Sequence, residues 1–181
     1  MLIDVRAAAV SFPDLLQTRG LYQFKPELPF VPGAEVAGEV IQAPADSGLA
    51  PGQRVAAFIA LGGMAERAVA PPFMTFALSD ALDFGQGAAL ILNHHTAYFA
   101  LRLRGRLASG EQVLVHGAAG GVGTAALQVA RGLGARTIAA VSTADKEQVV
   151  GARLTLEHGA EALRLIDERL ATGKVVLEPT P

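Results

Sequence analysis

The pattern of apolar and polar positions changes near residue 79. Before that point the chain carries short apolar runs typical of β-strands, and the loops between them hold eight of the ten prolines. The runs are LIDVRAAAV, AEVAGEVIQA, QRVAAFIA and AERAVAP. Residues 1–78 therefore predict a small β-rich module with irregular loops.

From Ser79 onward the apolar residues follow a helical spacing and then form continuous runs. The spacing of Ala88, Leu92, Ala97 and Leu101 predicts a helix from about residue 84 to 103. The segment EQVLVHG predicts an apolar strand of the type found inside parallel sheets, and RTIAAVST predicts a second strand.

Residues 121–133, between these two strands, predict a helix that ends before Gly134. Its expected apolar face consists of Val122, Ala126, Val129 and Leu133. Strand, helix and strand together make one βαβ unit.

The turn between the first of these strands and the helix is rich in glycine. The dinucleotide-binding pattern G-x-G-x-x-G falls on Ala118, Gly120 and Gly123, so its first position is alanine here. The N-terminus of the following helix would offer free N–H groups and a positive dipole end to phosphates. In this context we favour a phosphate-binding loop, with a plain tight turn as the alternative.

The end of the second strand bears on the choice of cofactor. An acidic residue about 20 residues beyond the glycines would hold a ribose 2′-hydroxyl and favour NAD. This chain instead has Ser142, Thr143 and Lys146 there, beside Asp145. Two hydroxyls and an ammonium suit a 2′-phosphate. The alternative is that Ser142 caps the next helix and Lys146 is a solvated surface residue.

Composition excludes several classes of protein. The chain has 181 residues, a formal charge of −2, 51% hydrophobic residues and no cysteine, so we expect a globular protein without disulfides or thiol catalysis. No cluster of Lys and Arg indicates binding to nucleic acid or to an anionic membrane. No apolar run reaches about 18 residues, and Asp4 and Arg6 interrupt the N-terminal one, so a cytoplasmic location is expected.

Six segments of the chain form a recognisable series: SFPDLLQTRGLY, PFVPGAEVAGEV, PGQRVAAF, NHHTAYFAL, VLVHGAAGGVGTAALQVARGLGA and VSTADK. In order and spacing they resemble the zinc-free quinone oxidoreductases of the medium-chain dehydrogenase/reductase superfamily. The resemblance implies an α/β protein with a GroES-like β-rich module at 1–83 and a partial Rossmann unit, a doubly wound parallel fold that binds NADP, at 84–150. Residues 151–181 would return to the module or pack at the interface.

The resemblance also implies an activity, which is metal-free hydride transfer from NADPH to a quinone or an α,β-unsaturated carbonyl compound. The implied cofactor-binding residues are Tyr22, Asn93, Thr96, Ala119, Gly120, Gly121, Val122, Gly123, Ser142, Thr143 and Lys146. Asn93 and Thr96 would lie near the nicotinamide, and Ser142, Thr143 and Lys146 near the 2′-phosphate.

Three residues would line the active site on the same resemblance: Ser11, Asp14 and Thr96. Ser11 stands where the family usually has asparagine. For Asp14, a structural role in the turn is an alternative to a chemical role. The zinc branch of the superfamily has Gly-His-Glu where this chain has Gly33, Ala34 and Glu35, so no metal site is expected.

The segment after Gly110 is short for a whole Rossmann domain. It has 71 residues, whereas two βαβαβ halves need roughly 30 residues or more per βαβ unit. We therefore expect a family member with a shortened N-terminus and an internal deletion, whose open sheet edge favours a homo-oligomer. Two functions remain open: an NADPH-dependent reductase, and a truncated, inactive NADP-binding or interaction protein.

Overall fold

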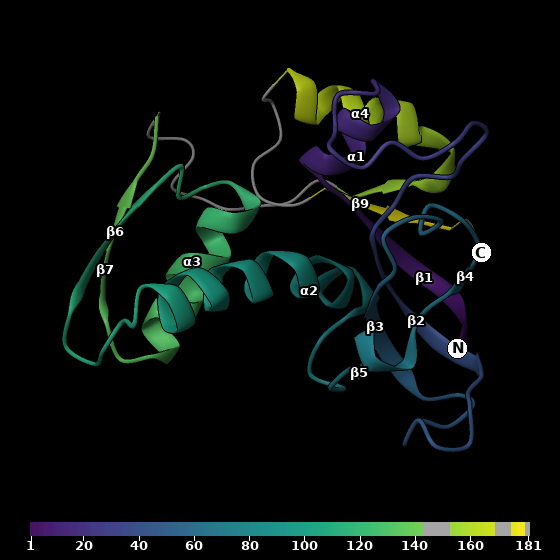
Figure 1. The fold of residues 1–181 in the computed structure, drawn as a ribbon, viewed down its shortest axis with the longest axis horizontal. Helices are drawn as coiled ribbons and strands as arrows, with labels where there is room; N and C mark the ends of the chain where they lie inside the picture. The colour runs from purple at the N-terminus through teal and green to yellow at the C-terminus, as the bar shows by residue number, and fades with distance from the viewer. Residues whose placement is uncertain (143–152, 169–174, 180–181) are drawn as a thin grey trace. The chain divides into compact units, whose positions relative to one another are not determined.

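The computed structural model describes residues 1–142, 153–168 and 175–179 (Figure 1). These residues form two compact units, the first made of residues 1–91, 153–168 and 175–179 and the second of residues 92–142. The boundary falls inside helix α2 (Phe84–Tyr98), between Ile91 and Leu92. The first unit has a largely antiparallel sheet and the second a parallel strand pair with helices, so the fold class is α/β as predicted.

The first unit is built on one sheet with the strand order β5-β3-β2-β1-β9-β8, and β4 also pairs with β1. The strands are β1 (Leu2–Val10), β2 (Glu35–Gln42), β3 (Arg54–Phe58), β4 (Arg67–Val69), β5 (Thr75–Ala77), β8 (Arg153–Thr155) and β9 (Val175–Glu178). All pairs are antiparallel except β8 with β9. The four apolar runs predicted as strands correspond to β1, β2, β3 and β4.

Both faces of this sheet are buried near β1. Ile3 and Val5 face one apolar cluster, whereas Ala7 faces the other. Side chains alternate with a period of two along a strand, and a register shift between Val5 and Ala7 reverses that alternation. The first part of α2 covers the second face, where Ala88 and Ile91 pack in the same cluster as Ala7.

Two helices, α1 (Phe12–Thr18) and α4 (Gly159–Asp167), complete the first unit, together with short 3-10 helices at Pro72–Met74 and Leu156–His158. Arg19, after α1, forms a two-bond ion pair with Asp167 at the end of α4, with N···O distances of 2.8 and 2.5 Å. The hydrogen bond from Arg19 lowers the pKa of the Asp167 carboxyl, and the same bond raises the pKa of Arg19.

The second unit contains the predicted βαβ arrangement. Residues 92–98 of α2 lead into a π-helix (Phe99–Arg104), followed by β6 (Gln112–His116), α3 (Gly121–Gly132) and β7 (Arg136–Ala140). Strand β6 runs parallel to β7, and Leu114 lies opposite Ile138.

The predicted apolar face of α3 is only partly confirmed. Leu133 packs against the cluster that contains Ala130, but Val122 is 48% exposed, and the fully buried positions of the helix are Gly123, Ala125 and Ala130. Small side chains allow the helix backbone to approach its neighbours closely, and this decides which face is buried.

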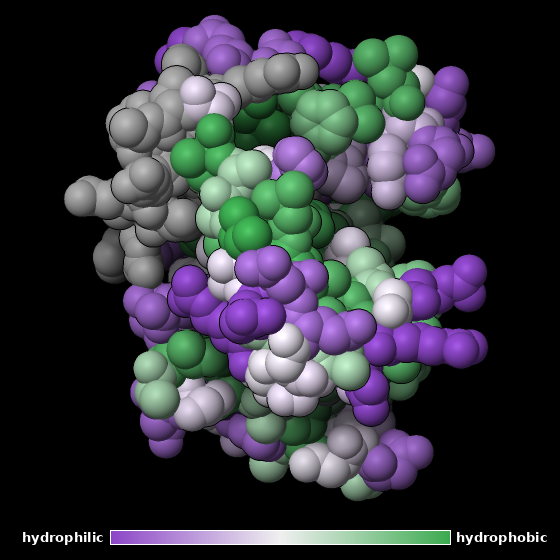
Figure 2. All heavy atoms as spheres, turned by 90° about the vertical axis from the view of Figure 1, so that its left-hand side faces the viewer, coloured by the Kyte–Doolittle hydropathy of each residue, from purple (hydrophilic) through white to green (hydrophobic). Residues whose placement is uncertain are grey.

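Strand β6 is open on one face, although a strand this apolar is usually buried on both faces. Leu114 is 54% exposed and Ile138 is 46% exposed. Within the described residues the β6–β7 sheet has only two strands, and α3 packs against one face, so the other face stays open. Figure 2 views this side of the chain and shows hydrophobic atoms at the surface among polar ones.

Candidate functional site

The glycine-rich loop turns the chain from β6 into α3. Gly117 adopts φ +63°, a left-handed conformation that glycine adopts without strain, directly after the last residue of β6. The N–H of Gly120 then donates to the carbonyl of Gly117 at 2.9 Å, and the N–H of Ala118 donates to the carbonyl of Ala140 at 3.2 Å. The loop is therefore held between the ends of both parallel strands, at the carboxyl edge where α/β sheets bind ligands.

The first turn of α3 carries free donors. Gly120 is the N-cap residue, and no side chain caps the helix. The N–H groups of Gly121, Val122 and Gly123 have no acceptor inside the helix, because the first N–H groups of an α-helix lack a carbonyl four residues earlier. They and the positive end of the helix dipole can bind an anion.

Each glycine at the start of α3 meets different surroundings. A methyl group at Gly123 would overlap the carbonyl oxygen of Gly117 and lie 2.8 Å from the Ala118 Cα. At Gly121 it would meet the Asn93 side chain, and at Gly120 only the Gly117 oxygen, at 3.3 Å. Gly120 is exposed and is the least crowded of these three glycines, so of the three it best allows a ligand to come close to the backbone.

The second unit is positively charged in its described part. Residues 92–142 contain Glu111 as their only acidic residue. The arginines are Arg102, Arg104, Arg106, Arg131 and Arg136. The whole chain has a charge of −2, so positive charge is concentrated in the unit that holds the loop, which favours an anionic ligand.

Helix α2 brings two predicted site residues into the same unit as the loop. Asn93 is 8% exposed and packs against Gly121. Thr96 is exposed, and its hydroxyl donates to the carbonyl of Leu92 at 2.6 Å. Ala119 is buried, whereas Gly120 and Val122 are exposed. Ser142 is exposed after β7, while Thr143 and Lys146 lie outside the described residues.

Ser11, Asp14 and Tyr22 belong to the first unit. Asp14 is fully buried, and its carboxylate accepts the N–H of Ser11 at 2.7 Å and the N–H of Gly33 at 3.1 Å. These bonds cap α1 and hold the Gly33 loop, so the geometry favours the structural role of Asp14. Tyr22 is half-buried in the loop after α1.

Sequence reasoning missed Glu35 as a buried acid. Its side chain is fully buried on β2, and the Ser11 hydroxyl donates to its carboxylate at 3.4 Å. The signal in the sequence was an acidic residue within an otherwise apolar predicted strand. Such a residue is a candidate for a buried carboxylate with a hydrogen-bond partner, because carboxylates are rarely buried without one.

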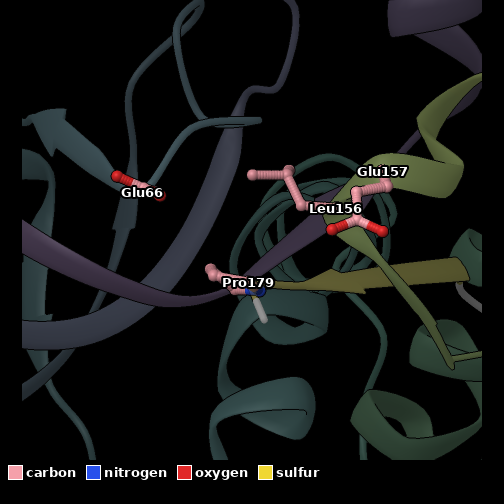
Figure 3. Close-up of a pocket in the computed structure, with 4 residues that line it drawn as sticks. All are labelled: Glu66, Leu156, Glu157 and Pro179. Carbon is pink, nitrogen blue, oxygen red and sulfur yellow. The ribbon is translucent and has the colours of Figure 1, made fainter. Parts of the chain in front are cut away.

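A pocket in the first unit is lined by Glu66, Leu156, Glu157 and Pro179 (Figure 3). None of these residues belongs to the predicted site. Two carboxylates in its lining oppose the binding of a phosphate, so this pocket does not suit a dinucleotide. Elsewhere in the described ranges, no group of three or more His, Asp or Glu side chains is arranged to hold a metal ion, and no helix is long and apolar enough to cross a membrane.

Known proteins share both the sequence and the fold. The model of the alcohol dehydrogenase GroES-like domain matches residues 1–80. Rat quinone oxidoreductase is 42% identical over 163 residues, which are 88% of this chain and 48% of that protein. A probable oxidoreductase from Mycobacterium abscessus matches with a TM-score of 0.92 and 32% identity, covering 98% of this chain and 90% of that chain.

The chain belongs to the quinone oxidoreductase family. Escherichia coli quinone oxidoreductase, solved in complex with NADPH, is another member, with a TM-score of 0.71 and 35% identity over 80% of this chain. The resemblance seen in the sequence is therefore confirmed. The chain spans about half the length of the curated quinone oxidoreductases it matches.

Proposed function

We propose that this chain binds NADPH through the loop at residues 117–123 and transfers its hydride to a quinone or an α,β-unsaturated carbonyl compound. The observation that carries the proposal is the uncapped start of α3 beside the exposed Gly120. A pyrophosphate is an anion of the right charge for these N–H groups, and Gly120 has no side chain to keep it away.

The charge of the second unit supports a phosphorylated ligand. Arginine is in excess over acid in residues 92–142, and the exposed Ser142 follows β7 at the end where the adenosine ribose would lie. Its hydroxyl would donate to a 2′-phosphate, which favours NADPH over NADH. The relative from E. coli was solved with NADPH, in agreement with this choice.

The reaction needs little acid–base chemistry from the protein. Bound NADPH supplies the hydride, and a quinone that accepts it becomes a hydroquinone after taking up a proton. The task of the chain is to hold cofactor and acceptor close together and to limit water. Thr96, which is exposed in the same unit as the loop, is proposed to lie near the acceptor.

A second candidate function is an NADP-binding or interaction protein without turnover. The observation that favours it is the two-stranded β6–β7 sheet, because one of its faces is open and the chain spans about half of its relatives. We also propose that Leu114 and Ile138 on this face drive self-association, since exposed apolar side chains on a sheet promote it. A cytoplasmic location remains a prediction from the sequence.

One experiment tests the binding site and separates the two candidates. The fluorescence of NADPH is titrated with the purified chain, and its absorbance is then followed with a small quinone present. Binding with turnover supports the reductase, whereas binding without turnover supports the second candidate. Absence of NADPH binding contradicts the reductase and the NADP-binding form of the second candidate.

The variant Gly120→Ala shows whether the loop is the site. Gly120 has φ −82° and ψ 169°, which alanine adopts without strain, and its methyl group would lie 3.3 Å from the Gly117 oxygen, so the fold should be kept with a small shift of that carbonyl. We expect its affinity for NADPH to fall about tenfold or more, because the methyl group stands where the phosphate approaches. Gly132→Ala, on the same helix with nothing within 4 Å, is the matched control and should bind as the wild type does.

A further inference from the structure

Gly121 is crowded by a single side chain from α2. A methyl group at Gly121 would lie 2.6 Å from Asn93 Nδ2, 3.3 Å from its Cγ and 3.5 Å from its Oδ1. The whole amide group therefore packs against the first residue of α3. Asn93 is only 8% exposed, so its amide has little room to turn away from a larger residue.

This contact differs from those at the neighbouring glycines. At Gly123 the close atoms belong to the backbone of the loop itself, and at Gly120 the nearest atom is a backbone oxygen. Backbone atoms cannot be removed by substitution, whereas the amide of Asn93 can. The crowding that a side chain at position 121 would meet therefore comes from α2.

A second contact joins the same two helices. His94 Nε2 lies 2.7 Å from Gln128 Oε1. Gln128 is seven residues after Gly121, which is two helical turns, so both positions lie on one side of α3. Asn93 and His94 thus contact α3 at its first residue and again two turns later.

We propose that Asn93 is a positioning residue for the glycine loop. Its amide sets how closely α2 approaches the first turn of α3, and so holds the direction of the N–H groups of Gly121 and Val122. The inference rests on the proposed function for the identity of the ligand. The contact between Asn93 and Gly121 stands without it.

A double-mutant cycle with NADPH as the probe tests this role. Gly121→Ala should weaken NADPH binding by about tenfold, because the new methyl group displaces either the amide or the helix. Asn93→Ala alone should have a smaller effect, because it makes space without adding volume. The double variant should bind NADPH several-fold more tightly than Gly121→Ala, which is a coupling that a general loss of stability would not produce.

The control is His94→Ala combined with Gly121→Ala. It removes the neighbouring contact between the helices but makes no space at Gly121, so it should not restore binding. The inference would be overturned if the variant that combines Asn93→Ala with Gly121→Ala bound NADPH no more tightly than Gly121→Ala alone. It would also be overturned if His94→Ala restored NADPH binding to Gly121→Ala.

Failure of the proposed function is distinguishable from failure of this inference. If the wild-type chain does not bind NADPH, the cycle is measured by the urea concentration at the midpoint of unfolding. A higher midpoint for the Asn93→Ala, Gly121→Ala double variant than for Gly121→Ala then supports the positioning contact. Additive shifts overturn it.

Discussion

Replacing Gly123 by alanine should destabilise the second unit, because this glycine lies where α3 comes closest to the loop. The added methyl group would overlap the carbonyl oxygen of Gly117 and lie 2.8 Å from the Ala118 Cα and 2.9 Å from the Gly117 carbonyl carbon. All three atoms belong to the backbone, so no side-chain rotation relieves the clash. The loop or the helix must move.

The magnitude follows from two opposing effects. Overpacking a tight site costs about 1–3 kcal/mol, and a clash with backbone belongs in the upper part of that range. Alanine in place of glycine inside a helix returns up to about 1 kcal/mol. The net loss of unfolding free energy is therefore about 2 kcal/mol, which corresponds to a lower Tm by about 4–8 °C for a chain of this size.

The assay is unfolding in urea followed by far-ultraviolet circular dichroism, with amide hydrogen exchange to locate the change. Exchange should accelerate in residues 112–140 and stay unchanged in β1 and β2. Gly132→Ala is the control on the same helix, and it should raise the free energy of unfolding by about 0.5 kcal/mol, since nothing lies within 4 Å of the new methyl group. Equal midpoints for the two variants would refute the close approach of α3 to the loop.

Two further predictions concern charge and association. The pKa of Asp167 is lowered by its hydrogen bond from Arg19, so the ion pair stabilises the fold above the ordinary carboxyl value of 3.8 and is lost as the pH falls through the lower folded value. Asp167→Asn should therefore lower the Tm slightly at pH 7, and the difference should shrink as the pH falls below 3.8; at pH 7, 1 M NaCl should also reduce it. A loss that does not change with pH would argue against the pair. Ile138→Thr keeps a β-branched side chain but removes apolar surface, so sedimentation velocity should show less self-association than for the wild type. An unchanged distribution would exclude this face as the contact.

Local sequence patterns predicted the elements better than their burial. Residues 112–116 and 136–140 are apolar, and the structure makes them parallel strands. Runs this apolar are typical of strands that are buried on both faces, but Leu114 is half exposed, since burial depends on which neighbours are present and not on the strand alone. The face of α3 was predicted only in part for a related reason, because hydropathy favoured Val122 while close packing buried Gly123.

Some features of the candidate site could be predicted from the local sequence, and others depend on contacts between distant residues. The G-x-G-x-x-G spacing identified the loop at 117–123, because a glycine turn after a strand and before a helix is a local property of the chain. The close approach of Asn93 to Gly121 and the hydrogen bond from Ser11 to Glu35 could not be predicted, since each joins residues more than twenty positions apart.

By itself, then, the sequence determined the family, most of the strands and helices, and the glycine-rich turn between β6 and α3, because all of these follow from the order of residues along short segments. Only the tertiary structure decided what surrounds each loop glycine: Gly117 has a positive φ, Gly123 contacts the loop backbone, Gly121 contacts Asn93, and Gly120 is exposed beside the Gly117 oxygen. The physical reason is excluded volume. The effect of adding a side chain at a glycine can be stated only when the atoms that would surround that side chain are known.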